Sequence, residues 1–254
     1  MGAVVVLSLA LRKEAFVAVV AGAMVVALYE LAVALGTRRI HVPVPPLLLG
    51  AVAMQVSAFL GGEEALFVAF VLTAVAVVVW TVLEAGEGAV RDVAAAVFAA
   101  AYVPLLGGFA VLMVAEDDGP RRIVVFVVTT VASDVGGYVF GVLWGRHPMA
   151  PSVSPKKSWE GSAGSAVFTM AAAVTGVVFL LDGPWWAGLV IGVAVTVSAT
   201  VGDLSESLLK RDIGIKDMGS LLPGHGGLMD RLDSLLLTAP VMYLLLTAFV
   251  PVAG

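Results

Sequence analysis

Long apolar stretches separated by short polar segments dominate this chain. Each stretch has roughly 20 residues, the length that an α-helix needs to cross a hydrocarbon layer about 30 Å thick. The stretches, bounded by charged residues, proline or glycine, fall near residues 15–35, 44–60, 65–83, 90–114, 121–143, 162–181, 185–202 and 233–251. The pattern predicts an all-α, polytopic transmembrane helix bundle.

The apolar opening stretch, residues 2–11, has about half of a spanning length and stops at Arg12-Lys13-Glu14. It lacks a basic region before the apolar residues and a clear cleavage site, which a signal peptide would show. We expect it to be the tail of a helix whose start is missing, so that the bundle has about eight to nine spans. A membrane β-barrel is excluded because its strands alternate polar and apolar residues, whereas these stretches are continuously apolar.

Composition narrows the chemistry. Of the 254 residues, 60% are hydrophobic and 13% are charged, against about 25% charged in an average soluble domain. The count of zero cysteines excludes disulfides and thiolate nucleophiles, and three scattered histidines argue against a zinc enzyme. The net charge of -5 without a dense basic stripe argues against a nucleic-acid partner. Carboxylates, lysines, arginines and one histidine remain as candidate reactive groups.

Basic residues separate by side when the loops between the predicted spans are numbered in order. One side carries Arg38, Arg39, Arg91, Arg146, Lys156, Lys157, Lys210, Arg211, Lys216 and Arg231. The other side carries the basic residues Arg12, Lys13, Arg121 and Arg122 and the acidic residues Glu63, Glu64, Glu116, Asp117 and Asp118. An excess of Lys and Arg marks the cytoplasmic side, so we expect the basic loops inside and the acidic loops outside.

Two of the inside loops are long and rich in polar residues, and they direct the search for chemistry. We expect one membrane domain, residues 1–254, with amino-terminal helices in 1–120 and a catalytic half in 121–254. The catalytic half contains the basic, proline-containing loop 144–161 and the charged, glycine-rich loop 203–232. We expect the active site at the cytoplasmic interface, where these loops lie.

Loop 203–232 and the residue after it combine oxygen ligands with cations. Asp203, Glu206, Asp217, Asp230 and Asp233 suit Mg²⁺ held by a few carboxylates and substrate phosphates. The basic side chains of the same loop can neutralise phosphate oxygens, and its glycines allow backbone N–H groups to approach a phosphate. On a helical extension of the span 185–202, Asp203, Glu206 and Lys210 would share one face. The alternative, a solvated loop that follows the positive-inside rule, does not explain why acids and bases interleave.

The polar residues of these loops resemble the signature of the phosphatidate cytidylyltransferases, also called CDP-diacylglycerol synthases. The match consists of Ser207-Leu-Leu-Lys210-Arg211, Lys216-Asp217, Pro223-Gly-His225-Gly226-Gly227 and Asp230-Arg231-Leu-Asp233. A second block, Ser154-Pro-Lys156-Lys157-Ser158-Trp159-Glu160-Gly161, resembles the family stretch SPKKTWEG, with serine in place of threonine. Asp134, Tyr138, Gly145 and Arg146 resemble a third family feature. The resemblance covers residues 130–240, and the earlier helices match in hydropathy alone.

The resemblance implies a nucleotidyltransferase of phospholipid biosynthesis. The phosphate of phosphatidic acid would attack the α-phosphorus of CTP, giving CDP-diacylglycerol and diphosphate. The implied partners are CTP, phosphatidic acid, membrane lipids and Mg²⁺, and the resemblance leaves a second cation and a homodimer open. The implied location is the plasma membrane, crossed several times, with the catalytic loops in the cytoplasm.

The same resemblance implies roles for individual residues. The candidate metal ligands are Asp203, Asp230 and Asp217. The candidate catalytic residues are Ser207, Lys210, Arg211, Asp217, His225 and Arg231, and the candidate substrate-binding residues are Asp134, Arg146, Lys156, Lys157, Gly226 and Gly227. Because a phosphate monoester has its second pKa at about 6, phosphatidate needs no general base at neutral pH, and positioning is the favoured role of His225.

Two acids lie inside predicted spans, where ionisable groups are costly and therefore functional candidates. For Asp134 the resemblance strengthens this interpretation. For Glu30 the alternative is a structural pair with Arg38 or Arg39 at the end of its helix.

Two other functions remain open. A CTP-dependent lipid kinase of the dolichol kinase type would use the same nucleotide and transfer its γ-phosphate. A membrane transporter would use Asp134 and Glu30 as ion sites, but it leaves the two charged loops unexplained. A CDP-alcohol phosphotransferase is disfavoured because its aspartate motif is absent from the sequence.

Overall fold

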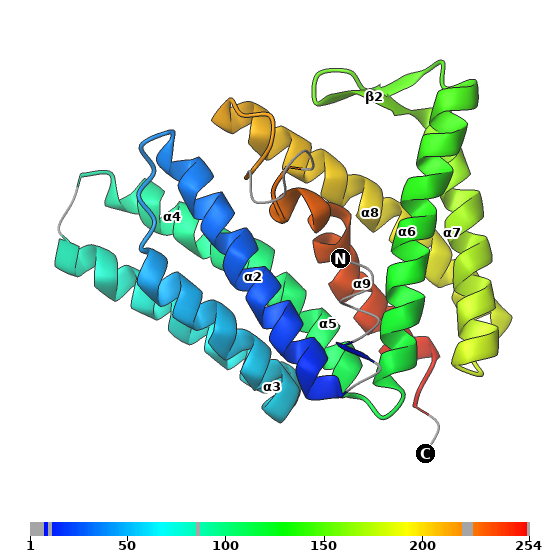
Figure 1. Cartoon of the computed structure of the whole chain (residues 1–254), viewed down its shortest axis with the longest axis horizontal. Helices are drawn as coiled ribbons and strands as arrows, with labels where there is room; N and C mark the ends of the chain where they lie inside the picture. Colours follow the sequence, from blue (N-terminus) through cyan, green and yellow to red (C-terminus); the bar gives the residue numbers. More distant parts are fainter. Residues whose placement is uncertain (1–7, 10–11, 85–86, 220–225, 253–254) are drawn as a thin grey trace. The chain divides into compact units, whose positions relative to one another are not determined.

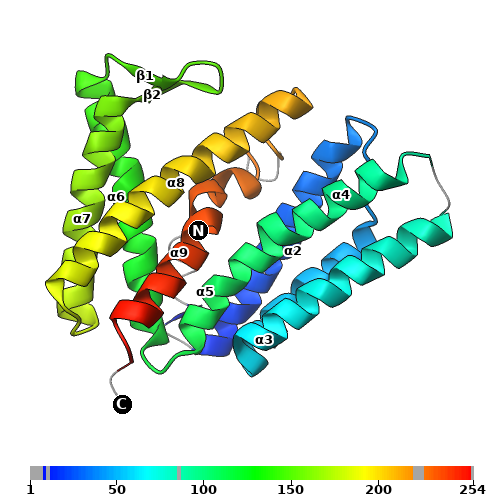
Figure 2. The same cartoon turned by 180° about the vertical axis from the view of Figure 1, so that it is seen from behind.

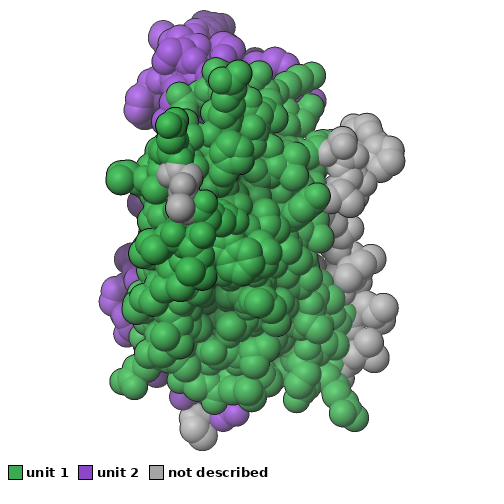
Figure 3. Space-filling view, turned by 90° about the vertical axis from the view of Figure 1, so that its left-hand side faces the viewer, with its two compact units in different colours: residues 1–115, 212–232 green, residues 116–211, 233–254 purple. Residues whose placement is uncertain are grey.

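The computed structural model describes residues 8–9, 12–84, 87–219 and 226–252. The apolar opening stretch 2–11 therefore lies mostly outside the described residues. The chain forms two compact units, which Figure 3 colours separately: residues 1–115 with 212–232, and residues 116–211 with 233–254. Each unit is described by itself below.

The first unit is built from helices that pack side by side. They are α2 (Lys13–Gly36), α3 (Val44–Glu84), α4 (Ala89–Ala100), η1 (Ala101–Leu105) and α5 (Leu106–Ala115), and the short turn η2 (Met229–Arg231) joins them from far along the chain. Both α4 and α5 contact α3, and α2 contacts α3, α5 and η2 (Figures 1 and 2). The contact between α2 and η2 brings the glycine-rich signature onto an amino-terminal helix, which the linear pattern does not indicate.

Helix α3 turns back on itself at Gly62. This residue has φ 70°, a left-handed value that glycine adopts without the steric cost of a Cβ atom. A Cβ on Gly50 would lie 2.3 Å from the side chain of Thr73, although the two residues would be about 35 Å apart along a straight helix. The two halves of α3 therefore pack antiparallel and correspond to the predicted stretches 44–60 and 65–83.

The segment from α4 to α5 is one apolar stretch with an interruption at Pro104. Proline lacks the N–H that a helix interior requires, and the chain widens locally into the π-helical turn η1 around it. The carbonyl of Pro104 accepts a hydrogen bond of 2.8 Å from Gln55 of α3. This bond ties the interrupted segment to α3 within the unit.

The second unit contains α6 (Gly119–Trp144), β1 (Pro148–Ala150), β2 (Ser154–Ser158), α7 (Trp159–Leu180), α8 (Trp185–Ile213) and α9 (Asp233–Phe249). Glycines let α6 and α7 approach closely: a Cβ on Gly136 would lie 2.5 Å from the carbonyl oxygen of Gly164, and one on Gly164 would lie 2.6 Å from that of Gly136. Small residues at helix contacts are typical of membrane bundles, where close packing drives association.

The prediction of an all-α membrane fold is confirmed. Among the described residues, six helical elements are long and apolar enough to cross a membrane, α4, η1 and α5 counting as one, and α9 is a shorter apolar helix. Large apolar side chains such as Leu60, Leu83 and Phe179 are exposed on the helices, as expected where lipid replaces water. Because α3 counts once although it doubles back, the total of eight to nine crossings stays a prediction.

Two of the predicted loops are more ordered than the sequence indicated. Within the predicted loop 144–161, residues 148–158 form an antiparallel β-hairpin, in which Pro148 pairs with Ser158 and Ala150 with Ser154. The segment 203–213 continues helix α8, so the loop predicted at 203–232 begins eleven residues later, after Ile213. This continuation confirms the predicted helical extension of the span 185–202.

Candidate functional site

The β-hairpin is anchored at the start of α7. The carboxylate of Glu160 accepts hydrogen bonds from the backbone N–H groups of Arg146 (3.1 Å) and His147 (3.2 Å), and it also contacts the His147 ring. The hydroxyl of Ser158 accepts from the N–H of Gly161 and caps α7. These contacts fix strand β2, which carries the predicted residues Lys156 and Lys157, while Arg146 is exposed at the hairpin base.

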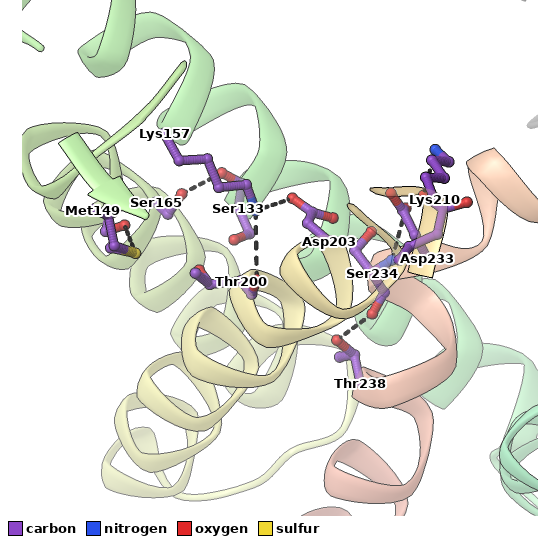
Figure 4. Close-up of polar contacts among 12 residues, drawn as sticks. Ser133, Met149, Lys157, Ser165, Thr200, Asp203, Lys210, Asp233, Ser234 and Thr238 are labelled. Carbon is purple, nitrogen blue, oxygen red and sulfur yellow. Dashed lines mark hydrogen bonds and ion pairs between the residues drawn. The ribbon is translucent and has the colours of Figure 1, made fainter. Parts of the chain in front are cut away.

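Lys157 turns from the hairpin toward helix α8. Its ammonium group lies 2.5 Å from the carboxylate of Asp203 and 3.5 Å from the carbonyl oxygen of Thr200 (Figure 4). The neighbouring Lys156 is exposed, because successive side chains of a strand point to opposite faces. The structure therefore brings together Lys157, from the second block of the resemblance, and Asp203, which lies just before the first block.

The helical extension of α8 presents charged residues at helical spacing. Lys210 lies 2.9 Å from Glu206, one turn away, as the sequence predicted for residues on one face. Ser207 is half-buried in the same turn, and Arg211 donates to the carbonyl of Val153 in the hairpin. Predicted site residues of α8 are thus held by contacts within the second unit.

Four carboxylates and two lysines form a cluster that we call the acidic cluster: Asp134, Asp203, Glu206, Asp233, Lys157 and Lys210. Asp203 lies close enough to Asp134 and Asp233 for their charges to repel, and Glu206 also lies near Asp233. Gly202 permits this approach, since a Cβ there would lie 2.5 Å from the carbonyl oxygen of Asp233. Because like charges disfavour one another, such a cluster favours bound cations.

In the first unit, the signature residues fold around Asp230. The Asp230 carboxylate accepts hydrogen bonds from the N–H groups of Met218 (3.1 Å) and Gly227 (2.7 Å). Gly226 has φ 78°, and a Cβ there would lie 2.9 Å from Asp230 and 3.6 Å from Asp217. The structure thus brings Asp217 and Asp230 to the same glycine, and the N–H of Gly227 already has a protein partner.

Two predicted residues remain, Arg231 and His225. Arg231 is exposed at the end of η2. His225, a candidate for positioning the substrate, lies outside the described residues, as does Gly224.

Glu30 has a role that the sequence did not indicate. The alternative of a pair with Arg38 or Arg39 was wrong: Arg38 donates to the carbonyl of Ile213 (2.6 Å), and Glu30 accepts a hydrogen bond of 2.9 Å from the N–H of Met229. An ionisable residue within an apolar span is a signal that the sequence does contain. The partner could not be found because it is a backbone group 199 residues away.

The donor set decides how a divalent cation could be held. No group of three His, Asp or Glu side chains within the described ranges is arranged to bind a metal ion by itself. Mg²⁺, however, is usually bound through one or two carboxylates and completed by water and substrate phosphates. Asp203 in the acidic cluster and Asp217 with Asp230 in the signature loop fit this mode, so a substrate-completed cation suits both groups.

The fold and the side chains define a class of protein: a polytopic membrane protein whose clustered carboxylates and lysines suit anionic groups and a cation. Comparison with known proteins makes this more specific. The family model described as the cytidylyltransferase family matches residues 1–249. This chain therefore belongs to the cytidylyltransferase family and is a nucleotidyltransferase, as the sequence predicted.

Individual relatives agree with the family model. A phosphatidate cytidylyltransferase of Mycobacterium leprae is 40% identical over 262 residues, which cover 97% of this chain and 84% of that protein. One of Mycobacterium bovis is 39% identical over 259 residues, covering 97% and 85%. One of Synechocystis is 34% identical over 178 residues, covering 68% and 58%. The match to the mycobacterial proteins includes the amino-terminal helices, for which the sequence offered hydropathy alone.

Proposed function

We propose that this protein is a phosphatidate cytidylyltransferase, which makes CDP-diacylglycerol and diphosphate from phosphatidic acid and CTP. The observation that carries the proposal is the 40% identity to a phosphatidate cytidylyltransferase over 97% of the chain. The geometry supports it, because Lys157 of the resemblance pairs with the candidate ligand Asp203, and Gly227 of the resemblance donates a hydrogen bond to Asp230.

The reaction joins two anions. A phosphate oxygen of phosphatidic acid forms a bond to the α-phosphorus of CTP, and the bond from that phosphorus to the oxygen bridging the α- and β-phosphates breaks, releasing diphosphate. Positioning and charge neutralisation contribute most of the catalysis in phosphoryl transfer. A bound divalent cation, which we propose to be Mg²⁺, would neutralise phosphate oxygens.

The protein residues have distinct proposed tasks. Asp203, Asp217 and Asp230 are the proposed cation ligands. Lysine ammonium groups are compact charges that suit phosphate oxygens, so Lys156, Lys157 and Lys210 are proposed to neutralise the substrates, together with Arg146, Arg211 and Arg231. Ser207, Asp134, His225, Gly226 and Gly227 are proposed to position the substrates.

The fatty-acid chains of phosphatidic acid are apolar and CTP is soluble, so the reaction belongs at a membrane interface. We propose that the protein lies in the plasma membrane with the hairpin and the signature loop on the cytoplasmic side. The excess of Lys and Arg in those loops supports this orientation. A homodimer stays a prediction from the resemblance.

The test uses purified protein in vesicles of phosphatidylcholine with Mg²⁺ and CTP. Diphosphate release is measured with added phosphatidic acid or with added diacylglycerol, which has the same chains but no phosphate. The proposal expects diphosphate release when phosphatidic acid is added and no release when diacylglycerol is added. Nucleotide consumption with diacylglycerol, without diphosphate, would contradict it and favour the lipid kinase.

A further inference from the structure

Glu30 is a buried carboxylate in an otherwise apolar helix. Its exposed fraction is 4%, and its buried neighbours in α2, Ala27, Leu28 and Leu31, are apolar. Burying a carboxylate is costly unless hydrogen bonds compensate. A group retained at such a cost has to be explained by what it contacts.

The polar contact that the structure shows for Glu30 comes from the backbone of the signature loop. One carboxylate oxygen accepts from the N–H of Met229 at 2.9 Å. A Cβ on Gly219 would lie 2.3 Å from the other oxygen, and a Cβ on Gly227 would lie 2.5 Å from the first. The two glycines thus leave the space that the carboxylate fills.

These contacts join the two ends of a short segment. A Cβ on Gly227 would also lie 2.7 Å from the N atom of Gly219, so residues 219 and 227 are adjacent at Glu30. Asp230 joins the same two parts of the loop, because its carboxylate accepts hydrogen bonds from the N–H groups of Met218 and Gly227. Glu30 and Asp230 therefore hold the same part of the backbone. Asp230 also directly follows Met229, whose N–H donates to Glu30.

We infer that Glu30 is a positioning residue, which holds the loop so that Asp217 and Asp230 are placed to bind the divalent cation. The inference rests on the proposed function, because that function assigns the cation to these aspartates. Glu30 itself does not contact the substrate. Its effect passes through the loop backbone at Gly219, Gly227 and Met229.

The first measurement is Mn²⁺ affinity by electron paramagnetic resonance, on the full-length protein in detergent with CTP present, because substrate phosphates complete the proposed site; the signal of Mn²⁺ bound to CTP alone is subtracted. Glu30→Ala is expected to weaken Mn²⁺ binding by at least about tenfold, because the loop loses its anchor. Glu30→Gln keeps an acceptor for the Met229 N–H and the same volume, and it should restore affinity to within about threefold.

Gln55→Ala is the matched control. Gln55 is fully buried in the same unit, and it also makes one hydrogen bond to a backbone group, the Pro104 carbonyl, away from the loop. It should lower the melting temperature as Glu30→Ala does but leave Mn²⁺ affinity unchanged. If both variants lower the affinity equally, or neither does, Glu30 is a structural residue and the inference is overturned.

The loop side of the contact gives a second test that leaves α2 intact. Gly219→Ala places a methyl group against Glu30, because the three atoms nearest to a Cβ on Gly219 all belong to Glu30. This variant should weaken Mn²⁺ binding as Glu30→Ala does. In the double variant, Glu30→Ala vacates the space for that methyl group, so the two effects should not add. Additive effects, or a Gly219→Ala variant that binds Mn²⁺ normally, would overturn the inference.

The outcomes separate this inference from the proposed function. A wild-type protein that binds no Mn²⁺ would overturn the cation assignment and with it the role of Glu30. Normal Mn²⁺ binding, with the expected coupling to Glu30 but without cytidylyl transfer, would overturn the proposed function alone.

Discussion

The Lys157–Asp203 pair joins residues that are 46 positions apart in the sequence. Both side chains are about one quarter exposed, and in a partly buried ion pair the cost of desolvation offsets much of the attraction. The pair therefore contributes little to the fold, and its value lies in holding a cationic and an anionic group at a fixed place within the acidic cluster.

Replacing Asp203 with asparagine tests this interpretation. Asp203→Asn is expected to reduce turnover by about 100-fold or more, because charge stabilisation in the transition state is lost. The melting temperature should change by no more than about 4 °C. Asp182→Asn is the matched control, since Asp182 is exposed in the same unit and its φ of 51° suits asparagine equally well. Equal activity losses in the two variants would contradict the role of Asp203.

Ser158 links the hairpin to α7 through its hydroxyl group. Ser158→Ala should lower the free energy of unfolding by about 1 kcal/mol, the usual cost of losing an N-cap. Ser158→Thr keeps the hydroxyl that accepts from Gly161 and should retain most of that stability. Thermal unfolding in detergent measures both, and a stable Ser158→Ala variant would show that the cap does not hold the helix.

At the scale of elements, close packing of α6 on α7 holds the helix that carries Asp134. Gly136→Ala would place a methyl group against the Gly164 carbonyl and should destabilise the protein by about 1–3 kcal/mol, as overpacking does. Gly22→Ala is the control, because nothing lies within 4 Å of its added Cβ, and it should be neutral or stabilising by up to about 1 kcal/mol. If Gly136→Ala unfolds at the wild-type temperature, α6 and α7 do not pack this closely.

Helix positions could be predicted because they depend on local apolar length, and α2, α6 and α7 lie where the sequence placed them. The hairpin at 148–158 could not, since its short strands contain proline and lysine and do not alternate apolar and polar residues. The environment of Glu30 could not either, because its partners are backbone groups whose approach depends on glycines far along the chain. The acidic cluster could be predicted in part. The sequence indicated its residues as candidates, but the contact between Lys157 and Asp203 could be found only from the structure.

At the scale of the whole molecule, an apolar bundle carries few charged residues, and the proposed site draws on those of the hairpin, the end of α8 and the signature loop. The apolar helices suit lipid, and the polar groups suit two phosphate-bearing substrates. This division explains why a chain with 13% charged residues can perform nucleotidyl transfer.

The most direct test of the central claim is the fate of the CTP phosphates. The protein would be incubated with phosphatidic acid, Mg²⁺ and CTP labelled at either the α- or the γ-phosphate, alongside the variant Asp230→Ala. The account predicts that α-label enters the lipid, that γ-label leaves as diphosphate, and that the variant transfers neither. Entry of γ-label into the lipid, or α-label transfer by Asp230→Ala at the wild-type rate, would contradict it.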